Sequence, residues 1–431
     1  MLIQVKPLIC QGAPQSNRNN VGGEVNEFTL NNGIKIIHRE IKDNPLVSIQ
    51  CFLYSGGANE TEEKAGLAGF TQSLMFKGTK NRNWEELAKE MESMGGNVSS
   101  DVASDYSDIG MTVLDSNADR AASILSDLIL NPVFSQDEID KEKANLLAGI
   151  KARKDRIFSF SDDIFIKTFY KNHPYSWPES GTESSVKNIS KKDIERWHNK
   201  YYSSGNMTII VFGNISLKNT KKICINYFGT IKNADTGSKL KPLKSPKHEA
   251  VKRSSDKFQQ AFLMIGFAAP SVDSTDYPTL KVINSVLGGR MTGKLFMELR
   301  EKMSLAYEVS SFYTSRKQLS RYVIYIGLKK ENIPSARKRI FEILSDLKEN
   351  GISDSELKDT RNFIKGTYLL DHQTLARKAW YAGWWQVMGK TYDYDEKYLE
   401  NLMAVSRNDI KRIANKYFDE NSVEVSVTPA K

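Results

Sequence analysis

The chain has 431 residues, which exceeds one ordinary domain and is long enough to bury a large core, so two or more domains are expected. Its 40% hydrophobic and 26% charged residues are typical of a globular protein and exclude a disordered or membrane-embedded chain. Lys and Arg (61) outnumber Asp and Glu (52), which gives a net charge of +9. Spread over a chain of this length, that charge produces only a weak electrostatic field and is typical of a solvated basic surface.

No apolar run approaches the roughly 18 residues that a membrane-spanning helix needs. The start of the chain is briefly apolar, but Lys6 and Pro7 interrupt it before a signal-peptide core forms. The sequence leaves the compartment open: the protein is periplasmic if an export signal has been removed, and otherwise cytoplasmic. Widely spaced cysteines without a C-x-x-C pair predict neither a disulfide framework nor a cysteine zinc site.

In chain order, residues 1–26 are rich in polar side chains and predict a flexible arm. Residues 27–38 predict two short strands around an Asn-Asn-Gly turn, and residues 46–54 predict a further strand that stops at Ser-Gly-Gly. Residues 85–93 have a helical pattern that ends before two glycines. Strands and helices therefore mix without strict alternation, which favours an α+β fold.

The second half of the chain repeats features of the first half in the same order. Residues 124–128 (Ile-Leu-Ser-Asp-Leu) recur as residues 343–347, and the helical segment 190–196 recurs as 406–412. A strand-like run follows the second match in both copies. This period is far longer than that of solenoid repeats, so the pattern predicts two copies of a whole domain.

These observations predict two homologous domains, each a mostly antiparallel sheet packed with helices. The first domain spans residues 27–232 and the second spans residues 253–431. Residues 233–252, with their Gly, Ser, Pro and Lys content, predict an exposed linker between them.

Motifs for an independent active site were not found. The five histidines do not lie at the i and i+4 spacing by which one helix holds zinc, and neither HExxH nor HxxEH occurs. A nucleophile elbow and a phosphate-binding loop are absent too. The basic charge comes without any RNA- or DNA-binding motif, so a nucleic-acid partner is not expected.

Residues 66–79 read G-L-A-G-F-T-Q-S-L-M-F-K-G-T. This segment resembles the G-L-A-H-F-x-E-H-x-x-F-K-G-T signature of the insulinase/pitrilysin zinc metallopeptidases, the inverzincins, and in particular their processing-peptidase-like bacterial branch. Flanking segments are similar as well, among them residues 131–134 and 173–175, and the resemblance covers the chain after residue 27. It implies the same duplicated α+β fold.

The metal positions depart from this family pattern. The resemblance implies that Gly69 and Ser73 stand where the family has histidine ligands, Gln72 where it has the general base, and Gly149 where it has the distal carboxylate. Glycine offers no ligand, and glutamine cannot accept a proton from a metal-bound water. No cofactor is therefore expected in this chain. The family's peptide-binding strand, N-A-x-T-S-x-D, is also altered, at residues 99–105.

The second half keeps a different family feature. Residues 295–307 read L-F-M-E-L-R-E-K-M-S-L-A-Y, which is similar to the family's L-F-x-E-L-R-E-x-x-x-L-A-Y. The resemblance implies that Arg300 and Tyr307 are the Arg/Tyr pair that reaches a zinc site and binds the substrate carbonyl.

Together these features favour a non-catalytic subunit of a heterodimeric zinc peptidase, which binds an unfolded peptide and supplies Arg300 and Tyr307 in trans. A homologous HxxEH-containing partner would carry the zinc and the base, so the chain alone is expected to be inactive. The alternative is a catalytically silent scaffold or peptide-binding protein of the same fold. Trp380, Trp384 and Trp385 predict a packed helix interface, with a chamber lining or a partner contact as the alternative.

Overall fold

The computed structural model describes residues 23–234, 236, 242–255 and 257–430. The arm predicted for residues 1–26 lies outside the described residues as far as residue 22, and the first strand, Val25–Thr29, begins inside the predicted range of the arm. The linker predicted for residues 233–252 likewise ends in a strand that starts at residue 249. Each predicted segment therefore overlaps a strand at its C-terminal end.

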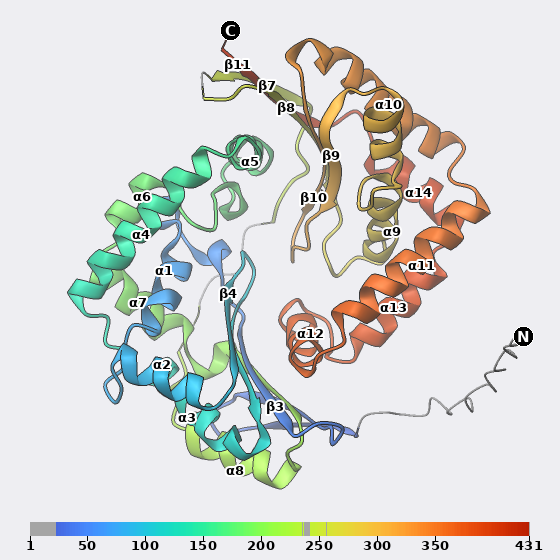
Figure 1. Cartoon of the computed structure of the whole chain (residues 1–431). Helices are drawn as coiled ribbons and strands as arrows, with labels where there is room; N and C mark the ends of the chain where they lie inside the picture. The colour runs from blue at the N-terminus through green and yellow to red at the C-terminus, as the bar shows by residue number, and fades with distance from the viewer. Residues whose placement is uncertain (1–22, 235, 237–241, 256, 431) are drawn as a thin grey trace, which may run out of the picture.

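The first sheet has the strand order β1-β2-β6-β3-β5-β4 (Figure 1). Only β2 and β6 run parallel in it. Its strands are β1 (Val25–Thr29), β2 (Lys35–Glu40), β3 (Leu46–Leu53), β4 (Asn97–Val102), β5 (Ser107–Leu114) and β6 (Met207–Gly213).

The second sheet has the order β7-β11-β8-β10-β9, and only β7 and β11 run parallel in it. This order and these directions repeat those of β2-β6-β3-β5-β4 in the first sheet. The predicted fold class, two homologous units with mostly antiparallel sheets, is confirmed. The strands are β7 (Glu249–Ser255), β8 (Ala261–Ala269), β9 (Ala306–Tyr313), β10 (Ser320–Leu328) and β11 (Val423–Pro429).

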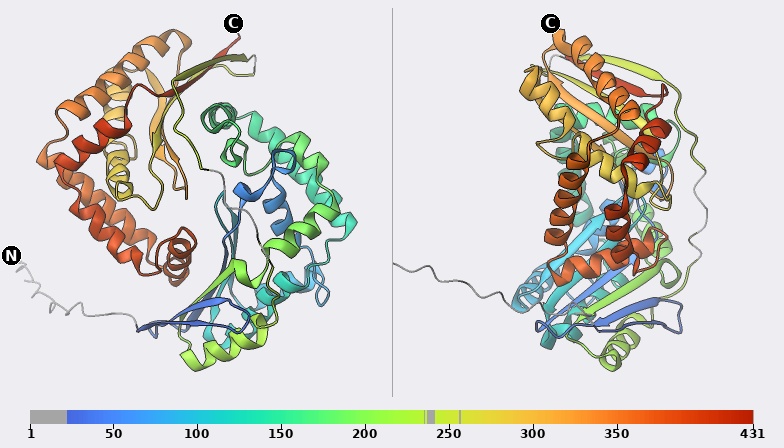
Figure 2. Two further views of the ribbon diagram at one scale, coloured as in Figure 1. Left: turned by 180° about the vertical axis from the view of Figure 1, so that it is seen from behind. Right: turned by 90° about the vertical axis from the view of Figure 1, so that its right-hand side faces the viewer.

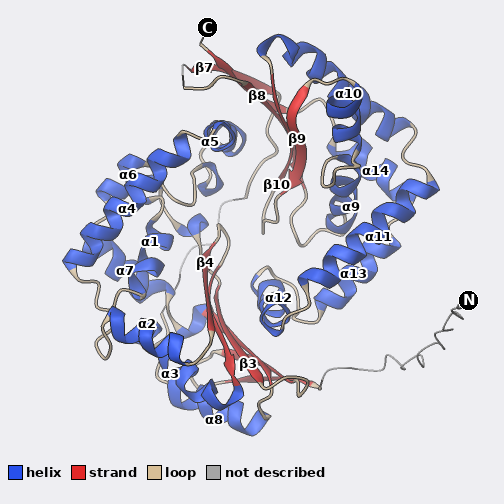
Figure 3. Cartoon of the chain, in the orientation of Figure 1, coloured by secondary structure: helices blue, strands red, loops and turns tan. Residues whose placement is uncertain are grey.

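Most helices lie on the outer sides of the two sheets, whose other faces look toward the middle of the molecule (Figure 3). None of the helices in the described residues combines the length and apolar composition that crossing a bilayer requires. The first half has α1 (Leu67–Met75), α2 (Trp84–Ser93), α3 (Ala118–Leu130), α4 (Gln136–Lys154), α5 (Ile157–Tyr170), α6 (Glu183–Asn188), α7 (Lys191–Tyr201) and α8 (Leu217–Phe228). The second half has α9 (Tyr277–Leu287), a π-helical segment (Phe296–Lys302), α10 (Ile333–Glu349), α11 (Asp354–Asp371), α12 (Leu375–Val387), α13 (Tyr394–Ala404) and α14 (Arg407–Tyr417).

The repeated sequence segments occupy equivalent places in the two halves. Residues 124–128 lie in α3 and residues 343–347 in α10, each helix following the second strand of a hairpin. Ser190 and Ser406 are the N-caps of α7 and α14. Each serine accepts a hydrogen bond from the backbone N–H of an aspartate three residues later, and the aspartate side chain accepts one from the serine N–H in return. The repeated sequence segments therefore encode the same structural features in both halves: a capped helix N-terminus in α7 and α14, and a buried helix face in α3 and α10.

Each half places one helix against the sheet of the other half. Helix α5 of the first half packs on β8 and β11, and α12 of the second half packs on β3 and β6 (Figures 1 and 2). Two glycines permit this close approach. A β-carbon on Gly266 of β8 would overlap with the ring of Phe165 in α5, and one on Gly383 of α12 would overlap with the ring of Phe52 in β3.

Polar contacts also join the two halves. Arg321 of β10 donates two hydrogen bonds to the Asp162 carboxylate of α5, at 2.5 and 3.0 Å, and both side chains are largely buried. The loop between β9 and β10 meets the loop between β4 and β5, where the Lys317 backbone N–H donates to the Asp105 carboxylate at 3.0 Å. The orientation of the halves is therefore held at several separate places.

We expect Gly383→Ala to lower the free energy of unfolding by about 1–3 kcal/mol, because the added methyl group overpacks the contact with Phe52. The matched control is Gly366→Ala in α11, where a β-carbon meets open space. That change should raise stability by about 0.5–1 kcal/mol, because alanine is the better helix former. Urea denaturation of both variants measures the difference, and equal effects would rule out the proposed packing constraint.

Candidate functional site

Helix α1 carries three of the four degenerate metal positions, and its start is held by a buried carboxyl group. Glu60 accepts hydrogen bonds from the backbone N–H groups of Gly66 at 2.8 Å and Ala68 at 2.7 Å. Burial raises the pKa of Glu60 to about 8 in spite of these two donors. Gly66 has a φ of +92°, and its close approach to the backbone at Gly181 leaves no room for a side chain.

Helix α4 packs beside α1 and carries the fourth position, Gly149. Gly69 and Ser73 lie one turn apart on α1 and so share a face of that helix. A β-carbon at Gly69 or at Gly149 would meet no atom within 4 Å. The Ser73 hydroxyl donates to the backbone oxygen of Phe70 at 2.9 Å within its own helix. Two of the three predicted ligand positions thus carry no side chain, and the hydroxyl at the third is bonded to the backbone of α1.

Gln72 is 2% exposed, and its amide is engaged at both ends. The Nε2 group donates to the Ser100 hydroxyl at 2.9 Å, to the Asp101 backbone oxygen at 3.0 Å and to the Asp108 backbone oxygen at 2.9 Å. The Tyr202 hydroxyl donates to Gln72 Oε1 at 2.8 Å. The side chain at the family's base position is therefore bonded to β4, β5 and the end of α7.

These residues do not fit a zinc ion. Zinc in peptidases is bound by imidazole, thiolate and carboxylate groups, and the four positions offer two glycines, one amide with its hydrogen bonds made and one neutral hydroxyl. Across the part of the chain that the structure describes, no group of three or more His, Cys, Asp or Glu side chains is arranged to hold a metal. No reaction step through a metal of this chain can be derived from this arrangement.

Arg300 and Tyr307 lie in the second half, in the π-helical segment and in β9. The Arg300 guanidinium lies 5.0 Å from the ring centre of Phe296 and is exposed. Tyr307 is 55% exposed. Within the described residues neither side chain has a hydrogen-bond or ion-pair partner, so their donors are free for another molecule.

The position of Tyr307 is set by an irregularity at the edge of the second sheet. Leu328 of β10 pairs with Ala306, but Gly327 pairs with Glu308, so Tyr307 is an extra residue in the edge strand β9. Such a bulge bends the strand and redirects the side chain that it carries. The sequence predicted the residue but could not predict the bulge.

The structure does not bring the two predicted sets of residues together. Gly69, Gln72, Ser73 and Gly149 lie on α1 and α4 of the first half, and the Arg/Tyr pair lies in the second (Figure 1). Among the described residues no hydrogen bond, ion pair or ring contact links the pair to α1 or α4. The two sets therefore share no such interaction within this chain.

The aromatic cluster of α12 is a packed interface, as the sequence predicted. Trp385 is fully buried and Trp384 is 8% exposed, while Trp380 packs between Phe52 and Tyr106 of the first half. This interface also contains a residue that the sequence did not single out. Asp108 of β5 is 1% exposed and accepts a hydrogen bond from Trp380 Nε1 at 3.3 Å.

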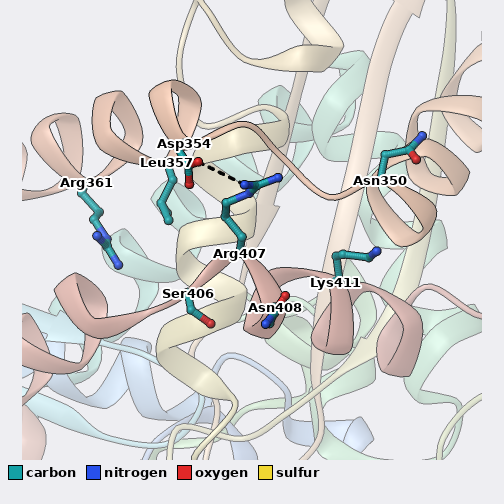
Figure 4. Close-up of a pocket in the computed structure, with 8 residues that line it drawn as sticks. All are labelled: Asn350, Asp354, Leu357, Arg361, Ser406, Arg407, Asn408 and Lys411. Atoms are coloured by element: carbon teal, nitrogen blue, oxygen red, sulfur yellow. Dashed lines mark hydrogen bonds and ion pairs between the residues drawn. The ribbon is translucent and has the colours of Figure 1, made fainter.

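A cavity of about 480 Å³ opens between the starts of α11 and α14 in the second half (Figure 4). It contains none of the predicted site residues. An ion pair of 3.1 Å between Arg407 and Asp354 crosses it, and the serine N-caps of both helices are satisfied within the chain. Its lining residues are Asn350, Asp354, Leu357, Arg361, Ser406, Arg407, Asn408 and Lys411.

Comparison with known proteins places these features in a family. Residues 35–183 match the family described as insulinase (peptidase family M16), and residues 188–364 match the peptidase M16 inactive domain. The chain belongs to the insulinase family of peptidases, M16. Among its relatives, the Bacillus subtilis protein named uncharacterized zinc protease YmxG is 28% identical over 94% of this chain and 98% of its own length. The Helicobacter pylori zinc protease PqqE is 24% identical over 93% and 92%.

Solved structures share the M16 fold over nearly the whole chain. A protease from Helicobacter pylori superposes with a TM-score of 0.88 and 22% identity, over 94% of this chain and all of that one. A peptidase M16 inactive domain from Pseudomonas fluorescens gives the same TM-score at 20% identity, over 95% and 98%. The inactive-domain match includes Arg300 and Tyr307, whereas α1 and α4 lie in the insulinase match. The inactive-domain match therefore does not bear on the metal positions.

Restoring the three M16 ligands by Gly69→His, Ser73→His and Gly149→Glu should create a zinc site, because two of these positions face open space. We expect the triple variant to hold about one zinc per chain by atomic absorption, and the wild-type chain to hold much less. The variant should still not cleave peptides, because Gln72 cannot act as a base. A variant with alanine at positions 69, 73 and 149 is the control for the effect of adding side chains that cannot bind zinc. Stoichiometric zinc in the wild-type chain would contradict this expectation.

A second prediction concerns pH. Burial raises the pKa of Asp108 from 3.8 to about 7, so the folded chain loses stability as the pH rises through this range. Asp108→Asn keeps an acceptor for Trp380 and removes the charge. We expect the stability of this variant relative to wild type to increase by about 1–3 kcal/mol between about pH 5 and about pH 8, measured by urea denaturation. A difference that does not change with pH would contradict the buried position of this carboxyl group.

Proposed function

We propose that this M16 protein is the non-catalytic, zinc-less subunit of a heterodimeric zinc metallopeptidase. It binds the peptide substrate and contributes Arg300 and Tyr307, and a homologous partner with an HxxEH motif supplies the zinc and the base. One observation carries the proposal: the positions that hold the metal in the family offer no usable ligand, while the Arg/Tyr pair stands exposed with free donors.

The chemistry of the pair suits a carbonyl group under attack. A guanidinium presents several N–H donors in a fixed plane, and a phenol presents one O–H donor. Both can donate to a carbonyl oxygen that gains negative charge as the peptide bond is broken. Neither group needs to exchange a proton in this role.

The location of the pair supports action in trans. Within the described residues no hydrogen bond, ion pair or ring contact links Arg300 or Tyr307 to α1 or α4, and both side chains are exposed to solvent. The bulge in β9 directs Tyr307 away from a regular strand position. A second chain can therefore approach the pair without rearrangement of the described residues.

The surroundings of the pair also support a contact surface. Met297 lies in the π-helical segment and is 38% exposed, Met303 follows it directly and is 41% exposed, and Met291, in the turn before it, is 74% exposed. Methionine is flexible and polarizable, so exposed methionines suit contacts with varied apolar side chains. Several large exposed apolar groups near one another are unusual for a surface that faces only water.

The test uses the chain reconstituted with an HxxEH-containing homologous subunit. Replacing Arg300 by Ala and Tyr307 by Phe should each slow peptide cleavage by roughly one to three orders of magnitude, because each removes a donor to the transition state. Zinc content and assembly of the pair should not change. Arg196→Ala and Tyr227→Phe are matched controls, since both side chains lie on outer helices of the first half.

Cleavage that is unchanged in both Arg300 and Tyr307 variants would favour the alternative, a silent scaffold or peptide-binding protein of the M16 fold. Chelator-sensitive cleavage by the isolated chain would contradict both functions.

A further inference from the structure

The π-helical segment Phe296–Lys302 is fastened to the rest of the second half through two of its side chains. Leu299 is fully buried in the core of that half. Glu298 accepts a hydrogen bond from Arg339 of α10 at 2.7 Å and another from Lys302 at 2.6 Å. One side chain in the core and one carboxylate bound to α10 therefore hold the backbone of this segment in place.

The backbone is also fixed at Arg300, where the segment ends. The Arg300 carbonyl oxygen accepts a hydrogen bond from the Ser304 N–H at 3.2 Å, and the Leu299 oxygen accepts one from the Leu305 N–H at 2.9 Å. Ser304 has a φ of +54°, a left-handed conformation that turns the chain toward β9. These contacts set the position of the Arg300 backbone, but they do not restrain its long side chain.

The Arg300 side chain is restrained by a ring. Across the described part of the chain no hydrogen bond or ion pair holds its guanidinium, which lies over the Phe296 ring at 5.0 Å from the ring centre. This distance is within the range of about 6 Å over which an aromatic face attracts a cation. Phe296 is half-buried and packs against the core of the second half, so the ring is itself held in place. A fixed ring therefore limits the motion of an otherwise free arginine.

A ring suits this role better than a carboxylate would. A carboxylate would accept the N–H donors of the guanidinium and so compete with a substrate for them. An aromatic face attracts the positive charge and leaves the donors in the plane of the guanidinium available. The Phe296 ring can thus hold Arg300 in one conformation and still leave its N–H groups free to donate to a carbonyl oxygen.

We propose that Phe296 is a positioning residue, whose ring holds the Arg300 guanidinium in place for the substrate carbonyl before the peptide binds. This proposal rests on the proposed function of Arg300 and adds a residue that acts on the substrate only through that arginine. A side chain that is ordered in advance loses less conformational entropy when it binds.

The test measures peptide cleavage by the chain reconstituted with the HxxEH-containing subunit. Phe296→Leu keeps an apolar side chain against the core and removes the aromatic face, so we expect kcat/KM to fall about two- to fivefold. Phe296→Tyr keeps the ring and should retain the wild-type value within about twofold. The matched control is Phe341→Leu in α10, which removes a ring that lies 4.8 Å from Arg337 instead, and it should leave kcat/KM unchanged.

A double-mutant cycle separates positioning from packing. In an Arg300→Ala background Phe296→Leu should leave kcat/KM nearly unchanged, because the ring has no guanidinium left to hold. An equal fall in the two backgrounds would show that the ring acts through packing alone and would overturn the proposal.

The motion of Arg300 is measured by NMR in the isolated full chain labelled with ¹⁵N-arginine, so this measurement does not depend on cleavage. The Nε–Hε signal that Arg300→Ala removes belongs to Arg300. We expect its order parameter to fall in Phe296→Leu and to be retained in Phe296→Tyr. An unchanged order parameter in Phe296→Leu would overturn the proposal. Cleavage that does not respond to Arg300→Ala would count against the proposed function, while the order parameter would still decide whether Phe296 holds the guanidinium.

Discussion

The reciprocal packing of α5 and α12 is the constraint on which the rest of this structure depends. Each sheet is covered on its outer face by its own helices and on part of its inner face by a helix from the other half. The central strands are therefore buried on both faces, and β3 and β8 are buried along almost their whole length. Gly266 and Gly383 lie where aromatic rings press on the backbone, so the two halves meet at van der Waals distance.

This constraint also fixes what surrounds the candidate site. Trp380 of α12 covers β5 at Asp108, and the backbone of Asp108 accepts a hydrogen bond from Gln72 on the opposite side. Only strand β5 therefore separates Gln72 from the interface between the halves. The Arg/Tyr pair lies apart from this region, in a segment with exposed methionines. The molecule thus separates a buried, hydrogen-bonded region from a surface that is exposed to solvent.

Much of this could be predicted from the sequence. The repeated segments of α3 and α10 are local patterns, and they indicated the duplication correctly. Gly69 and Ser73 could be assigned to family positions because the signature at residues 66–79 is continuous around them. The partners of Gln72 could not, because Ser100 and Tyr202 are 28 and 130 residues away. The burial of Asp108 under α12 depends on the meeting of the halves, which no local pattern describes.

The contact between the β4–β5 and β9–β10 loops has a mechanical consequence. With Lys317 bonded to Asp105 and Arg321 to Asp162, the two halves are joined by backbone and charged contacts as well as by α5 and α12. A hinge movement within this chain would have to break all of these contacts together. If the protein encloses a peptide together with a second subunit, this chain moves as one rigid body. The peptide then enters and leaves when the interface between the two subunits opens.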